Sequence, residues 1–94
     1  MNKVEKYKAM EKILRELDDL KNSQTAVIKK IGQIETENMN LNNQVLEKSL
    51  LKIYDGVYQN LQVVEELHQT FGESVKGFKA KENITDEMLM DIKA

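Results

Sequence analysis

The chain has 94 residues and a formal net charge of −2, with charged residues making up 32% of it and aromatic residues only 5%. It contains no cysteine, proline or tryptophan. A disulfide framework and a thiolate metal site are therefore excluded, and so short a chain can bury only a thin core. Stability must come from long helices and from self-association or a partner. The charge does not favour a general nucleic-acid binder.

The N-terminus carries Lys3, Lys6 and Lys8, but no apolar run follows them. A cleavable signal peptide needs such a run, and a membrane-spanning helix needs about 20 apolar residues in succession. We therefore expect no signal peptide and no membrane span. The expected location is the cytoplasm, and export without a cleaved signal stays open.

An apolar seam with alternating three- and four-residue steps runs from residue 10 to residue 45. Its members are Met10, Ile13, Leu17, Leu20, Val27, Ile31, Ile34, Leu41 and Val45. Two uncharged amides, Gln24 and Asn38, occupy the remaining places. So narrow a stripe is buried only when another helix lies alongside, so the pattern predicts one long helix with a helical neighbour. Asn2 is the one candidate N-cap for this helix.

A second seam follows with a different phase. Its members are Leu50, Ile53, Val57, Val64, Leu67, Phe71 and Phe78. The step from Asn38 to Leu50 rotates it about a third of a turn away from the first seam, at about 100° per residue. Asparagine often takes the left-handed conformation that ends a helix, and three asparagines lie in this step: Asn40, Asn42 and Asn43. A turn near residues 41–44 is the simplest interpretation.

Folding the chain at this turn pairs the two seams in antiparallel order. Pairs such as Leu41 with Leu46 and Ile31 with Val57 have residue numbers that add to 87 or 88 along the whole length. We therefore predict an all-α fold, an antiparallel two-helix coiled-coil hairpin over about residues 4–41 and 46–78 with a short C-terminal helix. The alternative is one long helix in a parallel coiled-coil dimer, in which Asn38 would set the register.

Some apolar residues lie beside the two seams. They form a flanking stripe that would face water in a single hairpin: Leu14, Ile28, Tyr54, Leu61 and Val75. Exposed stripes of this kind are typical of surfaces that bind another helix. We predict that the stripe is a partner interface. Either two hairpins form a homodimer, a four-helix bundle, or one hairpin pairs with another helical protein.

The regular pattern ends after Phe78, which divides the chain into a hairpin over residues 1–80 and a C-terminal segment over residues 81–94. This segment is expected to be a loop with a short helix, for which Thr85 is a suitable N-cap, or a flexible tail. The residues expected to dock it are Phe78, Glu82, Met88, Leu89 and Ile92. Because so short a helix is not stable alone, it packs on its own hairpin or folds onto a partner.

No grouping of residues points to catalysis. The single histidine, His68, has no serine nucleophile at a recognisable spacing. Adjacent carboxylates such as Asp18 and Asp19 point to different sides of a helix rather than toward one metal ion. There is no glycine-rich phosphate loop and no EF-hand spacing. We therefore expect no enzyme activity, no cofactor, no metal site and no small-molecule substrate.

Folding as a hairpin would gather cations at its open end. The basic patch is Lys8, Lys12, Arg15, Lys76 and Lys79. A solvated lysine-rich face is the plainer interpretation, and a docking site for an acidic partner or for nucleic-acid phosphates is the alternative. Tyr7 is the only aromatic residue interleaved with these cations, which weakens the case for nucleic acid.

Phe78 and Glu82 are an aromatic residue and an acid four positions later. This pair, the small size, the equal arms and the missing signal peptide resemble the small helical-hairpin proteins of type VII secretion and their helper subunits. That family's turn carries Trp-x-Gly, which this chain lacks because it has no tryptophan. The resemblance implies a secretion substrate or a targeting helper.

The expected function is that of a non-enzymatic helical adaptor or regulatory subunit, which acts by protein–protein interaction. The matched seams and the flanking stripe are the basis of this expectation. The alternatives are the secretion substrate or helper described above and a nucleic-acid-associated factor that uses the basic end.

Overall fold

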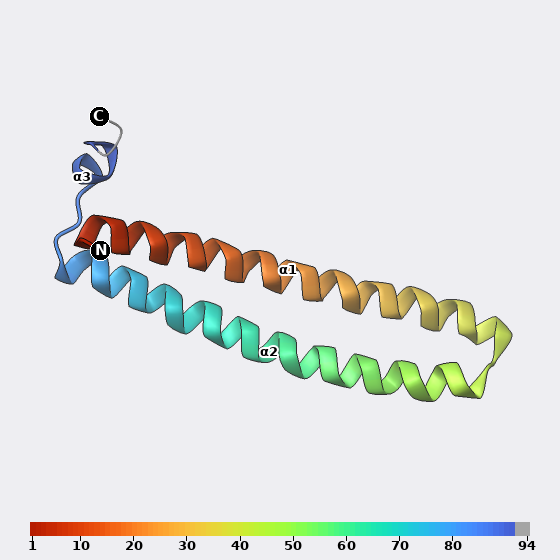
Figure 1. Ribbon diagram of the computed structural model, residues 1–94. Coiled ribbons are helices and arrows are strands. Elements are labelled where there is room, and N and C mark those ends of the chain that lie inside the picture. Colours follow the sequence, from red (N-terminus) through yellow and green to blue (C-terminus); the bar gives the residue numbers. More distant parts are fainter. Residues whose placement is uncertain (92–94) are drawn as a thin grey trace. The chain divides into compact units, whose positions relative to one another are not determined.

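Two long helices and one short helix make up the part of the chain that the structure describes. The structure, a computed structural model, describes residues 1–91. Helix α1 spans Lys3–Leu41, α2 spans Gln44–Lys81 and α3 spans Asp86–Asp91, with no strand among the described residues. The chain reverses direction between α1 and α2 (Figure 1). The predicted all-α hairpin is therefore confirmed, and the alternative of one long helix is wrong.

A reciprocal cap holds the first turn of α1. Asn2 Oδ1 accepts a hydrogen bond from the Glu5 backbone N–H at 2.8 Å, and Glu5 Oε1 accepts one from the Asn2 backbone N–H at 3.3 Å. This is a capping box with asparagine in place of serine or threonine. It satisfies two backbone donors, so α1 begins at Lys3 although lysines in this turn oppose the helix dipole.

The turn between α1 and α2 is built from asparagines. Asn42 is left-handed, with a φ of 57°, and its N–H donates to the Asn38 carbonyl at 2.6 Å. The Asn38 side chain spans the turn, because its Nδ2 donates to the Asn43 carbonyl at 3.0 Å and its Oδ1 accepts from the Asn43 N–H at 2.9 Å. Asn43 Oδ1 then accepts from the Leu46 N–H at 3.0 Å and caps α2.

The chain forms two compact units. Unit 1 contains residues 1–18 and the chain from residue 67 onward, and unit 2 contains residues 19–66. The core of unit 1 is centred on Tyr7, Val75 and Ile84. In unit 2 the buried apolar residues are Ile31, Leu50 and Val64. The polar residue Asn38 is buried in the same unit.

Contacts in unit 1 join early residues of α1 to late residues of α2. Lys3 Nζ donates to the Glu82 carbonyl at 2.8 Å, and Asp18 Oδ1 lies 3.9 Å from His68 Nε2. A Cβ added at Gly72 would lie 3.7 Å from Leu14 Cδ1. The two helices are therefore antiparallel in this unit, close to the predicted register.

We expect Asn38→Ala to lower the free energy of unfolding by about 1–3 kcal/mol, because it removes two hydrogen bonds that close the turn. Asn40→Ala is the matched control, since it makes the same change at an exposed helical site two residues away. Its expected effect is within about 0.5 kcal/mol. Urea unfolding followed by circular dichroism, at one protein concentration, measures both. Equal effects of the two substitutions would contradict the role given to Asn38.

Gln24 lies in unit 2 with its carbonyl oxygen buried and no hydrogen-bond partner for it among the described residues. An unsatisfied buried oxygen costs about 1–3 kcal/mol, so Gln24→Leu should raise the free energy of unfolding by about 1 kcal/mol or more. Gln24→Glu should lower it, because a charge would then occupy the same position. The same urea titration measures the two variants. A Gln24→Leu protein less stable than the wild type would refute this account.

Candidate interaction surface

Unit 2 turns one row of residues on each helix inward, and the adjoining row adds only two apolar residues, Ile28 on α1 and Leu61 on α2, since Glu35 and Tyr54 of those rows are exposed. The inward residues on α1 are Gln24, Ile28, Ile31 and Asn38, and those on α2 are Leu50, Val57, Leu61 and Val64. All of them are buried or half-buried. Because seven residues make almost two turns, each row stays on one side of its helix along the unit.

A neighbouring row on each helix is apolar but exposed. Its members are Leu20, Val27, Ile34 and Leu41 on α1, and Leu46 and Ile53 on α2. Their exposed fractions run from 37% to 68%. We call these six residues the apolar face. The next place of the α2 row is taken by Asn60, which is also exposed.

Both rows of the apolar face lie on the same side of unit 2. Ile34 follows the buried Ile31 by three positions, and Ile53 follows the buried Leu50 by three positions. Two antiparallel helices are related by a 180° rotation about an axis perpendicular to the plane that contains them both. This rotation exchanges the two helices and leaves each side of the pair facing the same way. Positions with the same relation to the buried row therefore share one side.

The α2 edge of this side carries no charge. The row outside Leu46 and Ile53 is exposed and consists of Ser49, Gly56 and Val63. Gly56 has open space where a Cβ would lie. The corresponding row on α1 is Ser23, Lys30 and Glu37. A long uncharged strip on an exposed helix is typical of a surface that packs against another protein, since charged residues are depleted at interface cores.

The residues predicted as a partner interface lie at other places. They are Ile28, Tyr54 and Leu61 in unit 2, and Leu14 and Val75 in unit 1. Val75 is only 4% exposed and belongs to the core of unit 1, against which Leu14 packs. Ile28 and Leu61 are half-buried. Tyr54 is 36% exposed and stacks on Tyr58, with ring centroids 5.9 Å apart.

The sequence pattern predicts that the flanking stripe faces water and that the seam is buried. Both expectations are wrong for some of these residues. Val75 is buried, whereas the predicted seam residues Ile34 and Ile53 are exposed. The two rows share one seven-residue period and adjoin the same buried row, so periodicity does not separate them. A rotation of about 50° about each helix axis exchanges their places.

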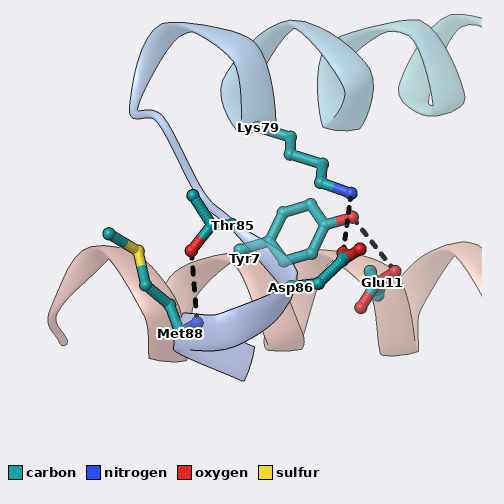
Figure 2. Close-up of polar contacts among 6 residues, drawn as sticks. All are labelled: Tyr7, Glu11, Lys79, Thr85, Asp86 and Met88. Carbon is teal, nitrogen blue, oxygen red and sulfur yellow. Dashed lines mark hydrogen bonds and ion pairs between the residues drawn. The ribbon is translucent and has the colours of Figure 1, made fainter. Parts of the chain in front are cut away.

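The C-terminal segment packs within unit 1. After α2 ends, Asn83 takes the left-handed conformation with a φ of 53°, and Ile84 is buried at 4% exposure. Thr85 Oγ1 accepts a hydrogen bond from the Met88 N–H at 3.2 Å and caps α3 (Figure 2). Leu89 packs against the core of this unit. The described part of the segment, residues 81–91, is therefore docked on its own chain.

The predicted docking residues have different places. Phe78 and Leu89 pack against the core, and Lys6 Nζ lies 5.4 Å from the Phe78 ring centroid. Met88 and Glu82 are half-buried. Ile92 lies outside the described residues. The set of docking residues omitted Tyr7. Ile84 stands just before the N-cap Thr85, where an apolar residue predicts a packed helix start, and it belongs to the core against which Leu89 packs.

The cations of the predicted basic patch have acidic neighbours in unit 1. Lys79 Nζ lies 3.7 Å from Asp86 Oδ1 and 5.9 Å from the Tyr7 ring centroid, and Figure 2 shows the three side chains together. Arg15 and Lys76 line a groove that contains two acids, Glu11 and Glu73. The other two members are Lys8, which is half-buried, and Lys12, which is exposed.

The single histidine lies beside one carboxylate. His68 Nε2 lies 3.9 Å from Asp18 Oδ1, and both side chains are partly exposed. Within residues 1–91 no three histidine, cysteine, aspartate or glutamate side chains are grouped so that they could hold a metal ion. None of the described helices is long and apolar enough to cross a membrane.

Comparison with known proteins finds no matching family model, no similar curated protein and no similar solved structure. A function is therefore inferred from the apolar face.

Burial raises the pKa of the Tyr7 hydroxyl, as do its hydrogen bond to Glu11 at 3.1 Å and the charges of Glu11 and Asp86. The folded state then holds this proton more tightly than the unfolded chain. Its contribution to stability is complete below about pH 10 and is lost as the pH rises through the folded value. Between about pH 9 and pH 11, wild type should lose more stability than Tyr7→Phe.

Urea unfolding of both proteins at the two pH values measures this difference, and the Tyr7→Phe protein is the control for lysine titration. The same loss of stability in both would show that Tyr7 does not titrate as described.

Proposed function

We propose that the protein is a non-enzymatic helical adaptor or regulatory subunit, and that it binds another helical surface through the apolar face. The proposal rests on one observation, namely which row of α1 is exposed in unit 2. The exposed row contains Leu20, Val27, Ile34 and Leu41. The row on the other side of the buried row contains Lys21 and Ile28, which are half-buried, and Glu35, which is exposed. The row made up only of apolar residues is therefore exposed along its whole length, while the more polar row is partly buried.

Leaving this row in water is unfavourable. Full burial of one such side chain is worth about 1.5–3 kcal/mol, and monomeric proteins rarely expose contiguous apolar patches above a few hundred Å². An isolated helix pair would gain stability by turning the apolar row inward. A partner that covers the row accounts for its outward position.

The partner should present amphipathic helices. Apolar side chains at three- and four-residue steps on its surface would fit between the α1 and α2 rows of the apolar face, as in coiled-coil packing. Gly56 and Ser49 at the α2 edge allow a partner backbone to approach closely. The proposed location is the cytoplasm.

A pull-down from extract of the native cells tests the proposal, with wild type, Ile53→Lys and Leu51→Lys as baits. Leu51 is the matched control, because it is 53% exposed where Ile53 is 50% exposed and points to the opposite side of α2. Proteins retained by wild type and by Leu51→Lys, but lost by at least about tenfold with Ile53→Lys, are the expected result. An identical set of proteins on all three baits would overturn the proposal.

A further inference from the structure

We infer that the apolar face packs against the apolar face of a second copy of the chain, with both turns at the same end of a four-helix bundle. The inference rests on the proposed function, because it names the partner of the same surface.

The accessible surface of the chain is large for its mass. It amounts to 7272 Å², whereas a folded monomer of 10.9 kDa exposes about 5,600 Å² by the usual relation of area to mass. The excess of about 1,700 Å² lies within the roughly 1,000–2,500 Å² that each partner buries in an obligate dimer. A second copy on the apolar face would cover part of this excess.

The apolar face is complementary to itself. Its positions pair across unit 2 as Leu41 with Leu46, Ile34 with Ile53, and Val27 with Asn60. A twofold axis parallel to the helices brings each pair against the same pair of the second copy. The first two pairs then become four-residue aliphatic layers, which bury all of their exposed side chains.

Asn60 explains how such a bundle would keep its register. It is the one polar residue among these pairs, and the twofold axis brings the two Asn60 amides into a single layer. Each amide has a donor and an acceptor to offer the other. One amide layer in an otherwise apolar seam fixes the alignment of packed helices, because any shift buries an unpaired amide against an aliphatic side chain.

The edges of the face select the orientation of the two copies. With both turns at one end, the outer row of α1 lies beside the outer row of α2 from the other copy. Lys30 then lies beside Gly56, Glu37 beside Ser49, and Ser23 beside Val63. The larger side chain of one copy meets a smaller one of the other at each level, and the aliphatic stems of lysine and glutamate cover the small residues.

The opposite orientation lacks this match of sizes. With the turns at opposite ends, α2 would lie on α2 and α1 on α1. When the two Ile53 residues lie at one level, the small residues Ser49 and Gly56 of the two copies face each other, which leaves voids.

Sedimentation equilibrium of the purified full chain tests the dimer, with Ile53→Lys and the Leu51→Lys control. Wild type and Leu51→Lys should be dimers at micromolar concentration, and Ile53→Lys should raise the dissociation constant by at least about a hundredfold. Circular dichroism checks that all three remain helical. A wild type that stays monomeric up to millimolar concentration, or a dimer equally stable with Ile53→Lys, would overturn the inference.

Spin labels test the orientation, and the absence of native cysteine makes single labels clean. With both turns at one end, labels on Asn40→Cys are separated only by the width of the bundle, about 30 Å or less. The opposite orientation places these labels about 40 Å apart when it is centred on Asn60, and it places labels on the exposed Asn22→Cys about 40 Å apart when it is centred on Ile53. Electron paramagnetic resonance distance measurements distinguish the two values, and the longer one would refute the proposed orientation.

These experiments separate this inference from the proposed function. A purified chain that is monomeric, but loses a bound cellular protein with Ile53→Lys, overturns the second copy as partner and leaves the adaptor function standing. A dimer that depends on Ile53 supports the inference whichever other proteins the extract contains.

Discussion

The hydrogen bonds of the Asn38 side chain across the turn are the constraint on which unit 2 depends. Asn38 is 7% exposed and holds both the N–H and the carbonyl of Asn43. The two helices therefore leave the turn in one register, which places Leu41 opposite Leu46 and Ile34 opposite Ile53. A shift of one residue in one helix would rotate its side chains by about 100° and divide the apolar face.

Amides at apolar positions serve three different purposes in this chain. Asn38 is satisfied by backbone groups of the turn, so its burial carries no penalty. The buried oxygen of Gln24 has no partner within the described residues, so it lowers stability. Asn60 is exposed, and its cost or benefit depends on what covers the apolar face. An amide side chain therefore closes the turn at Asn38, lowers stability at Gln24 and lies beside the apolar face at Asn60.

The hairpin could be predicted because its signals are local. Two regular seams, a change of phase and the asparagines at Asn42 and Asn43 locate the turn without any knowledge of tertiary contacts. The inward row could not be predicted, because the rows of Ile28 and Ile34 have the same period, and the row of Ile34 is exposed although it is the more apolar of the two. The central place of Tyr7 was also missed, since it depends on contacts between residues far apart in the sequence.

The uncharged α2 edge has a consequence for how the surface responds to its surroundings. From Leu46 to Val63 neither the apolar row nor the row outside it contains a charged residue. Association through such a surface depends on the release of water from apolar groups rather than on ion pairing. It is therefore little affected by ionic strength and is weakened by cooling, the reverse of what the ion-paired surface around Lys79 and Asp86 would show.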